Sequence, residues 1–502
     1  MVEWSALLNG VAALISWQIM YVLLSGVFFG VLCGAIPGFT ACMAVAVLLP
    51  VTYGMSPLVG MTLLVSTYAG AIYGGSITAI LLNCPGTPAA ACTAFDGYEM
   101  TKQGKHNEAL GLAIGSSVVG GSISYFFLLV LMYPIAAFAI KFGSPEMFIL
   151  AILGLTIIAS IGKGNFAKSI LAGLFGLLIS TVGISPTGAI RANFGLVGLM
   201  DGVPIVPAII GFLAFSELFS MLHTEFIVEG GDNSTKKKNI FTIIKYSFYC
   251  FKYPMTLIKS ILIGTFIGAV PAAGASVASF VSYNQAKQSS KNGDNFGKGE
   301  MEGIVASESA NNASTGGALC TMLAIGIPGS GTTAILLGAL MLHGLQPGPR
   351  LFMFQMELVY GIIIALFLSQ IILFIAGVTF SYYLSGIVNI STKILVPTIA
   401  LLSIVGSFAL QNSIFDAQLM FVFGLIGWVM KKNDYPVIAA VLGIILGPIA
   451  DSNLIRTAIR YRNDFTVFFT RPVSLVLIIF IVLSMVLPII VKKIDIKKQK
   501  KT

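Results

Sequence analysis

The chain of 502 residues has few charged side chains: Asp, Glu, Lys and Arg together make up 10% of it. Soluble domains usually contain about a quarter charged residues, so this composition argues against an ordinary soluble protein. The three histidines are scattered, and the six cysteines lack the CxxC spacing of a metal site. We therefore interpret the cysteines as small buried residues and expect neither a disulfide nor a metal cluster.

Motifs of common enzymes are also missing, since the sequence contains neither HExxH nor GxSxG. The stretch "GSGTTA" from Gly329 lacks the preceding strand of a dinucleotide fold, and "FGKGE" from Phe296 lacks the upstream glycine and the Ser/Thr of a phosphate-binding loop. Glu308 near serines is the only feature that favours a membrane-embedded hydrolase, and no nucleophile–base spacing accompanies it. We predict that the chain is not an enzyme and has no cofactor.

Apolar residues, in contrast, make up 56% of the chain, and the mean hydropathy is +0.93. Apolar runs recur at 19–36, 56–72, 110–139, 146–161, 167–184, 203–222, 257–270, 304–327, 356–383, 394–409, 414–430, 435–449 and 473–491. A spanning helix needs about 20 mostly apolar residues, and several runs are shorter. We therefore expect an all-α polytopic membrane protein with about ten to twelve spans and additional re-entrant or broken helices.

The basic residues predict the orientation. The net charge of +9 comes largely from "KKKNIFTIIK", Lys431–Lys432 and the tail "VKKIDIKKQKK". Such loops mark the cytoplasmic side of a membrane protein, so we place a basic linker at 224–256 and a tail at 492–502 in the cytoplasm and expect no nucleic-acid partner. Arg456, Arg460, Arg462 and Arg471 fall on the face that span parity makes external, so either that segment is interfacial or the span count is wrong by one. No basic segment precedes the first apolar run, so we expect no cleavable signal peptide.

One phrase occurs twice: Gly-x-x-x-Gly-Ala-aliphatic-Pro begins at Gly30 and again at Gly264, 234 residues later. A second pair follows, "YGGSITAILLNCPGTP" from Tyr73 and "TGGALCTMLAIGIPGSG" from Thr315, with the Gly-Gly pairs 242 residues apart. Two matched motifs in the same order indicate a duplication. We predict two pseudo-symmetric membrane repeats, 1–223 and 257–491, in inverted orientation.

The repeated Pro and Gly residues predict breaks in membrane helices. These residues are Pro37, Gly38, Pro85, Gly86, Pro271, Gly274, Pro328 and Gly329. Broken helices are tolerated in a membrane where they are buried in protein or line a cavity, and paired breaks in two halves are typical of a transporter's binding site. The freed N–H groups attract an anion, and the freed carbonyl groups can hold Na⁺. The alternative is that the glycines serve close helix packing and the prolines only kink the helices.

The stretch "SESANNASTGG" is the most polar part near an apolar run. Glu308, Asn311, Asn312 and Thr315 follow an i, i+3, i+4, i+7 spacing, so a helix places them on one face. The Gly-Gly alignment sets Ser66, Ala69, Gly70 and Tyr73 against them, so the two halves differ chemically here. We predict that Glu308, Asn311 and Thr315 couple a cation, because intramembrane carboxylates and amides are costly unless they face a cavity, a partner or an ion. The alternative is that Glu308 lies at the interface and the amides cap a helix end.

Short polar side chains surround the breaks. We predict that the solute contacts Thr40, Ser76, Asn83, Thr87, Asn311, Asn312, Ser330, Thr332 and Thr333. The hydroxyls suit a carboxylate or Na⁺, and they equally suit hydrogen bonds back to helix carbonyls. Arg191 and Arg350 could be counter-charges for an acidic solute or could lie at a water interface.

The motifs also resemble a known family. "GAIPGFTACMAVAVLLPVTYGMSPL", "YAGAIYGGSITAILLNCPGTPAAACTAFDGY", "ESANNASTGGAL", "IGIPGSGTTAILLGALMLHGLQPGP" and "FFTRPVSLVL" are similar to the large membrane subunit of tripartite tricarboxylate transporters, from about Leu24 to Pro488. The resemblance implies a bacterial inner-membrane importer of carboxylates driven by Na⁺ or H⁺. It also implies a small membrane subunit and a periplasmic solute-binding protein as partners. Phe39–Thr40, Thr87 and "PAAGAS" depart from the family pattern at the predicted site.

The sequence therefore predicts a secondary active transporter for a di- or tricarboxylate or related organic anion. Its mobile part would contain both sets of breaks, and the two halves would shift around the site. A passive anion channel, in which the same breaks line a filter, is the alternative. A homodimer in the lipid bilayer would suit a mobile part that moves against a fixed scaffold, although no residue pattern indicates one.

Overall fold

A computed structural model describes residues 4–36, 39–83, 85–139, 142–161, 166–221, 239–271, 273–383 and 413–483, with 396–397, 400–401, 403–405 and 407–408 between the last two ranges. The chain forms two compact units, each built from two segments. Unit 1 consists of Met1–Ala136 and Glu217–Ser413, and unit 2 of Ala137–Ser216 and Ile414–Thr502. Both repeats predicted from the sequence therefore contribute their first part to unit 1 and their last part to unit 2.

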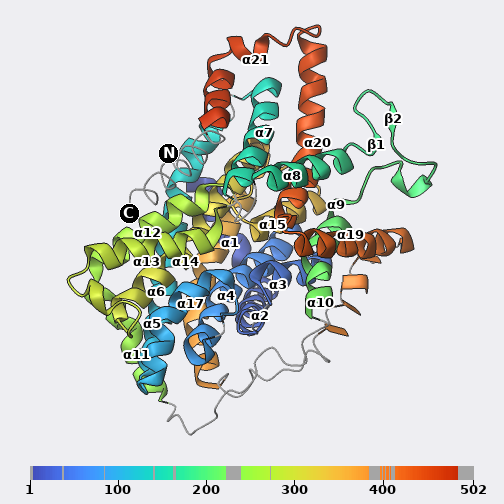
Figure 1. The fold of residues 1–502 in the computed structure, drawn as a ribbon. Coiled ribbons are helices and arrows are strands. Elements are labelled where there is room, and N and C mark those ends of the chain that lie inside the picture. Colours follow the sequence, from blue (N-terminus) through green and yellow to red (C-terminus); the bar gives the residue numbers. More distant parts are fainter. Residues whose placement is uncertain are drawn as a thin grey trace, which may run out of the picture. The chain divides into compact units, whose positions relative to one another are not determined.

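Unit 1 is helical (Figure 1), and its sequence ranges include the positions of all the predicted breaks. Its helices are α1 (Trp4–Leu14), α2 (Trp17–Gly34), α3 (Ala41–Leu48), α4 (Pro57–Leu82), α5 (Ala91–Lys102), α6 (His106–Ala139), which runs past the boundary of the unit, α11 (Ile240–Ser247), α12 (Pro254–Ala269), α13 (Gly274–Ser289), α14 (Met301–Ile325), α15 (Gly331–Leu342), α16 (Pro349–Phe354) and α17 (Met356–Tyr383). Short 3-10 turns lie at Pro50–Thr52, Pro88–Ala90, Phe248–Lys252 and Gly293–Asn295.

Unit 2 is helical with one small hairpin. It contains α7 (Ser144–Ile161), α8 (Phe166–Ser180), α9 (Ile205–Ile209), the π-helical segment Ile210–Phe215, α10 (Ser216–Met221), which crosses into unit 1, α19 (Ile414–Lys432), α20 (Val437–Arg460), α21 (Val467–Thr470), the strands β1 (Gly183–Ile184) and β2 (Ile190–Arg191), and the 3-10 turn Val197–Leu199. The strands are antiparallel, with Gly183 opposite Arg191. Helices α7 and α8 both pack on α20.

The all-α, multi-pass architecture is confirmed. Six described helices are long and apolar enough to cross a membrane: α2, α4, α6, α17, α19 and α20. A seventh crossing results if the segment Ile240–Lys252 and α12, which meet at an angle of 85°, count as one broken span. Shorter apolar helices such as α3, α8 and α15 account for much of the remaining apolar sequence. Several predicted spans are shorter than expected because the Pro and Gly breaks divide them.

The duplication is visible in the packing of the helices. In the first half α2 packs on α4, and in the second half α12 packs on α14, each time with glycines against backbone carbonyls. A Cβ on Gly34 would lie 2.2 Å from the carbonyl oxygen of Ala71, and one on Gly268 would lie 2.1 Å from that of Ser314. The other matched contacts are Gly30 with Thr67 and Gly264 with Ala310, then Gly74 with Val31 and Gly317 with Thr265.

These contacts correct the alignment of the halves by one residue. Ala71 corresponds to Ser314 and Gly74 to Gly317, so α4 and α14 are related by 243 residues rather than 242. Glu308, Asn311, Asn312 and Thr315 therefore correspond to Val65, Tyr68, Ala69 and Ile72 of the first half. The predicted difference in chemistry remains, because the first half has no carboxylate or amide at these positions.

Within each half the two breaks meet. A Cβ on Gly86 would lie 1.9 Å from the carbonyl oxygen of Gly34, and one on Gly329 would lie 2.3 Å from that of Gly268. Each Pro-Gly pair thus returns to the end of the helix that precedes the first break. Pro37 and Gly38 lie outside the described residues, as do residues 224–238 of the predicted linker and the tail 492–502.

The halves also interlock. Helix α3, after the first break of the first half, contacts α15, which follows the second break of the second half. Helix α13 has the matching place in the second half and contacts the turn Pro88–Ala90 and α5. The helix before α2 and the helix before α12 each pack on a helix of the other half. Helix α1 packs on α17 at Gly10, and α11 packs on α6 at Gly111 and Gly115. The inverted orientation of the halves in a membrane remains a prediction.

The close glycine contacts predict selective sensitivity to alanine. Gly34→Ala and Gly268→Ala should each lower the free energy of unfolding by about 1–3 kcal/mol, because the new methyl group overpacks a helix interface. Gly173→Ala in α8 is the control, since its Cβ would lie 3.6 Å from the nearest atom, and alanine suits a helix better than glycine. The measurement is the thermal midpoint in detergent. Equal midpoints for Gly268→Ala and Gly173→Ala would contradict the packing.

Candidate functional site

Glu308 is fully buried in α14. It lies seven residues after the start of that helix, among α4, α5, α12 and α13, all of which contact α14. Glu308 is therefore shielded from water by protein, while its depth in the membrane remains a prediction. A buried carboxylate must find hydrogen-bond donors to replace its water.

The donors come from the first half of the chain. Ser76 Oγ in α4 donates to Glu308 Oε1 at 2.6 Å, and Thr93 Oγ1 in α5 donates to the same oxygen. Ser117 Oγ in α6 donates to Oε2 at 2.9 Å, and Asn312 Nδ2 approaches Oε2 at 3.5 Å from within α14. We call Glu308, Ser76, Thr93, Ser117 and Asn312 the Glu308 cage. It joins three helices of one half to a carboxylate of the other.

All donors in the cage are uncharged. None of the ion pairs among the described residues includes Glu308. The neighbouring amide of Asn311 is buried beside Glu308 and interacts with its carboxylate, although no hydrogen bond of normal length and angle uses its Nδ2 or Oδ1. A carboxylate whose neighbours are all uncharged can accept a proton or a small cation without displacing a resident charge.

Thr315 belongs to a different cluster. Its Oγ1 contacts the Tyr125 hydroxyl at 3.0 Å and the carbonyl oxygen of Asn312 at 2.6 Å. Gln370 Nε2 of α17 donates to the same tyrosine at 3.3 Å. The structure thus brings Glu308, Asn312 and Ser76 together, with Asn311 beside them. Thr315 lies further along α14, in the cluster with Tyr125 and Gln370.

The break after α4 has a special backbone at Asn83. Asn83 ends the helix in the left-handed region at φ 56°, and Gly326 at the corresponding position after α14 has φ 82°. Asn83 therefore has a capping role that asparagine and glycine can fill. Its side chain is exposed, and no hydrogen bond among the described residues uses it. Thr87, beyond Pro85 and Gly86, is buried with its Oγ1 unpartnered.

The hydroxyls at the other breaks cap helices. Thr40 Oγ1 accepts the Met43 N–H at 3.3 Å at the start of α3. Ser330 and Thr333 form a reciprocal capping box at the start of α15. Tyr68 of α4 lies near both Ser330 and Cys42, so the beginnings of α3 and α15 converge on it.

The remaining predicted residues lie around the same breaks. Thr332 is buried in the first turn of α15, Pro328 and Gly329 precede it, Pro271 is half-buried in a turn after α12, and Gly274 begins α13 at φ 64°. Capping explains the hydroxyls of Thr40, Ser330 and Thr333 without a ligand. The contact of the predicted residues with a solute remains a prediction.

Two residues of the cage were missed by the sequence analysis. Thr93 lies in "CTAFDGY", and Ser117 follows Ser116 inside the apolar helix α6. Polar residues inside apolar runs of the first half were the available signal, but their approach to Glu308 depends on tertiary packing.

Asp96, one turn after Thr93, is bound by the loop that contains the motif "FGKGE". The Asp96 carboxylate is fully buried, and its Oδ1 accepts the N–H groups of Gly297, Gly299 and Glu300 at 2.8–2.9 Å. Tyr283 donates its hydroxyl to Oδ2 at 2.7 Å. Gly297 and Gly299 have positive φ angles, so the loop forms an anion-binding nest. The anion in this nest is a side chain of the first half.

Two arginines of unit 2, Arg191 and Arg471, form ion pairs with carboxylates. Arg471 Nε donates to the buried Glu146 carboxylate at 2.5 Å, and Ser474 donates to the same oxygen at 2.8 Å. Arg471 and Ser474 both belong to the stretch "TRPVS", so this stretch binds the buried Glu146 carboxylate. Arg191 forms a bidentate pair with Asp451, and Arg350 of unit 1 bonds to Gln346. Among the described residues, no hydrogen bond joins Arg191 or Arg350 to the Glu308 cage.

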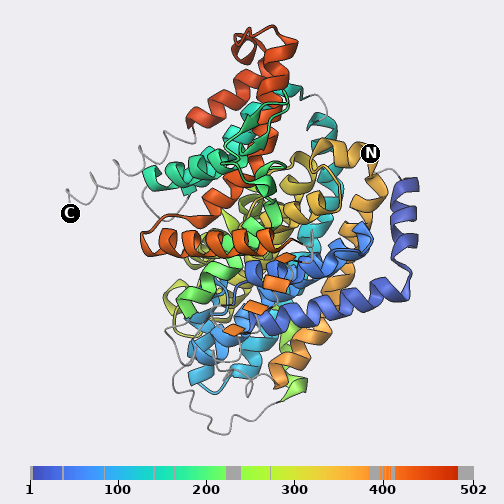
Figure 2. The ribbon, with the colours of Figure 1, turned by 90° about the vertical axis from the view of Figure 1, so that its right-hand side faces the viewer.

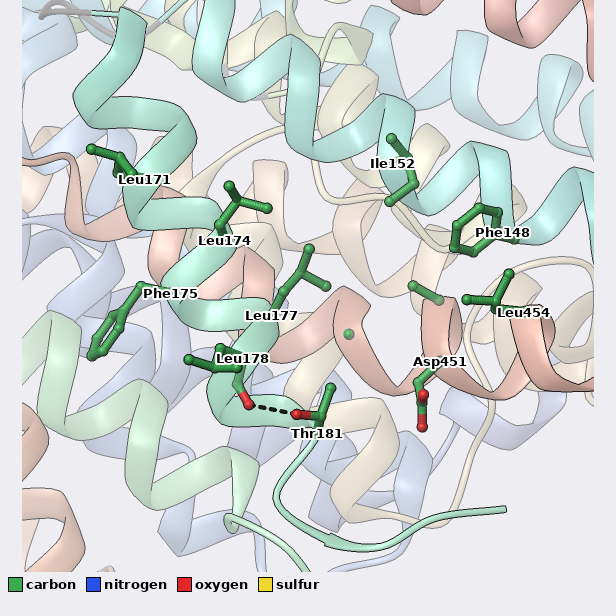
Figure 3. A pocket seen from close by; sticks show the side chains of 12 residues that line it. Phe148, Ile152, Leu171, Leu174, Phe175, Leu177, Leu178, Thr181, Asp451 and Leu454 are labelled. Carbon is green, nitrogen blue, oxygen red and sulfur yellow. Dashed lines mark hydrogen bonds between the residues drawn. The ribbon is translucent and has the colours of Figure 1, made fainter. Parts of the chain in front are cut away.

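A hollow of about 600 Å³ lies in unit 2, among α7, α8 and α20 (Figure 3). Its walls are mainly Leu, Ile and Phe side chains, and its acidic residue, Asp451, is already paired with Arg191. An apolar hollow of this kind suits acyl chains or an apolar helix better than an anion. We therefore assign the candidate site to the Glu308 cage and the adjacent breaks.

Comparisons with known proteins agree with the sequence motifs. The model of the tripartite tricarboxylate transporter TctA family matches residues 20–442. An uncharacterized 52.8 kDa protein from the TAR-I ttuC' 3' region of Agrobacterium vitis is 34% identical over 450 residues, which cover 89% of each chain. A protein from the TAR-II ttuC' 3' region of the same organism is 33% identical over 211 residues, 42% of this chain and 87% of the relative. No solved structure matches the chain.

The nest predicts a structural role for Asp96. Asp96→Ala should lower the free energy of unfolding by about 2–4 kcal/mol, because three N–H groups and a tyrosine hydroxyl lose a charged acceptor. Asp96→Asn should lose less, since it keeps one acceptor oxygen. Asp294→Ala, an exposed acid in the same loop, is the control. Thermal unfolding in detergent gives the comparison, and the nest has no structural role if Asp96→Ala and Asp294→Ala unfold together.

Proposed function

The chain belongs to the tripartite tricarboxylate transporter TctA family, and we propose that it is the large membrane subunit of a secondary active importer. The solute is a di- or tricarboxylate or a related organic anion, and its uptake is coupled to Na⁺ or H⁺. A periplasmic solute-binding protein delivers the solute, and a small membrane subunit completes the system in the bacterial inner membrane. The C-terminus of the chain faces the cytoplasm.

The Glu308 cage is the observation that supports ion coupling most strongly. Its donors Ser76 and Thr93 stand on either side of the break at Asn83–Thr87. Ser76 precedes Asn83 by seven residues, about 10 Å along a helix. A proton or cation on Glu308 weakens the hydrogen bonds that the charged carboxylate receives. Binding of a proton or cation to Glu308 therefore weakens the hydrogen bonds from Ser76 and Thr93, which lie on either side of the break.

The breaks supply the anion site. The first turns of α3 and α15 come from different halves and converge on Tyr68. Their N–H groups and the hydroxyls of Thr40, Ser330, Thr332 and Thr333 suit carboxylate oxygens. Asn83 and Thr87 lie at the break of the first half, and Asn311 and Asn312 lie beside Glu308. Movement of one half against the other then exposes the site to each side of the membrane in turn.

Uptake into proteoliposomes tests the proposal. The purified chain, with its binding protein and small subunit, should accumulate a labelled dicarboxylate or tricarboxylate saturably under an imposed Na⁺ or H⁺ gradient, and an ionophore should abolish the accumulation. Linear flux that ignores the gradient would instead support a passive channel.

Glu308→Gln should reduce gradient-driven uptake at least tenfold or abolish its ion dependence, because the amide cannot take up a proton or balance a cation. Glu99→Gln, which removes a carboxylate from a surface pair with Lys102, is the matched control. Both variants should be recovered folded from the membrane. Normal ion dependence in Glu308→Gln would remove this residue from the coupling mechanism.

Asn83→Gly separates capping from binding. Glycine keeps the left-handed helix end, as Gly326 does in the second half, but removes the amide. If the amide binds a carboxylate, the apparent KM should rise about tenfold, because a hydrogen bond to a charged group contributes about 1.5–3 kcal/mol. An unchanged KM together with normal stability would assign Asn83 to capping alone.

A further inference from the structure

Helix α11 and the turn Phe248–Lys252 form an amphipathic segment, which we call the surface segment. Ile243, Ser247 and Cys250 are buried at i, i+4, i+7 spacing. The opposite face exposes three aromatic rings, Phe241 at 79%, Phe248 at 60% and Phe251 at 55%. Lys245 and Lys252 are exposed beside them.

At the end of the surface segment the chain turns sharply, and its exposed side chains become mainly apolar. The surface segment and α12 meet at 85°. The exposed face of α12 is apolar, with Met255, Ile258, Leu262 and Phe266. One lysine, Lys259, is exposed on α12, and it lies in the first half of this helix. A helix that enters the hydrocarbon core has such an apolar face, whereas a helix that lies in the headgroup region mixes aromatic and basic residues.

We propose that the surface segment lies in the cytoplasmic surface of the bilayer and binds anionic phospholipid headgroups. Phe241, Phe248 and Phe251 insert among the upper parts of the acyl chains, and Lys245 and Lys252 contact the phosphates. The Lys252 ammonium lies 3.7 Å from the centre of the Tyr249 ring, and the centres of the Tyr246 and Tyr249 rings are 4.3 Å apart, with the rings tilted by 31°. These contacts hold the lysine and the rings at one level.

The corresponding helix of the first half has no such charge. Helix α1 precedes α2 as α11 precedes α12, and the two dark blue helices α1 and α2 also meet at a sharp bend in Figure 2. Helix α1 exposes Leu8 at 65% and is followed by Trp17 at 93%, but contains no charged residue. Basic residues favour the cytoplasmic surface. Inverted halves place α1 and the surface segment at opposite surfaces, and only the cytoplasmic one then carries lysines.

The surface segment packs closely against the helix that supplies Ser117. A Cβ on Gly115 of α6 would lie 1.8 Å from the carbonyl oxygen of Ser247, and one on Gly111 would lie 2.5 Å from that of Ile243. Ser117, two residues after Gly115, donates to Glu308. Lipid binding therefore fixes the level of one wall of the Glu308 cage relative to the membrane surface. This consequence, unlike the lipid binding itself, rests on the proposed function.

Titration of the purified full chain with phosphatidylglycerol or phosphatidylcholine, followed by native mass spectrometry, tests the binding. The wild-type chain should bind phosphatidylglycerol more tightly than phosphatidylcholine. Lys245→Gln/Lys252→Gln should weaken phosphatidylglycerol binding about thirty-fold, because each lysine near an anionic surface contributes about 1 kcal/mol. Lys245→Arg/Lys252→Arg should retain the affinity.

Lys287→Gln/Lys291→Gln removes the same charge from exposed positions in and after α13, outside the aromatic face, and should weaken phosphatidylglycerol binding clearly less than Lys245→Gln/Lys252→Gln. Equal losses in the two glutamine pairs, or equal binding of the two lipids by the wild type, would overturn the proposal. Because the lysines are exposed, every variant should keep the wild-type thermal midpoint.

The depth of the segment provides a second, independent measurement. Phe248→Trp in vesicles should be quenched more strongly by lipids brominated near the headgroup than by lipids brominated near the chain ends, after subtraction of the wild-type signal. Absence of additional quenching would place the face outside the bilayer and assign it to a protein partner. That result would not affect the gradient-driven uptake on which the proposed function depends.

Discussion

Burying the Glu308 carboxylate costs free energy that only hydrogen-bond donors or a cation can offset. The protein places this carboxylate on α14 of the second half and its donors Ser76, Thr93 and Ser117 on α4, α5 and α6 of the first. The two halves must therefore pack together for either to be stable. The Asp96 nest repeats the arrangement in reverse, since a carboxylate of the first half is held by N–H groups of the second. Helix α5 carries both Thr93 and Asp96 and thus links the cage to the loop before α14.

Close helix packing and helix breaks act together. The Gly-x-x-x-Gly residues bring α2 within contact of α4 and α12 within contact of α14, in the manner of membrane helix pairs. The same close approach lets Gly86 and Gly329 return to the ends of α2 and α12. The packing interpretation and the break interpretation of the repeated phrase are therefore complementary. A break held in this way has a defined position, as a binding site for a small anion requires.

Much of this arrangement could be predicted from the sequence. Apolar runs gave the all-α multi-pass fold, and repeated phrases gave the duplication. The spacing of Glu308, Asn311 and Asn312 gave one polar helix face. The alignment was wrong by one residue because adjacent glycines at 74–75 and 316–317 look alike in sequence, while only Gly74 and Gly317 make equivalent contacts. Thr93, Ser117 and Asp96 were missed because their partners lie about 190 to 215 residues away. The span count stays a prediction, since six described helices have the length and apolarity of a crossing and shorter apolar helices lie beside the breaks.

The central claim is that the Glu308 carboxylate itself takes up the coupling proton or cation. Infrared difference spectroscopy of the purified chain, between low and neutral pH and between Na⁺ and K⁺ buffers, measures this directly. The account predicts a carboxyl band that responds to pH, or a carboxylate band that shifts with Na⁺, in the wild-type protein and its disappearance in Glu308→Gln. Identical difference spectra for the two proteins would contradict it.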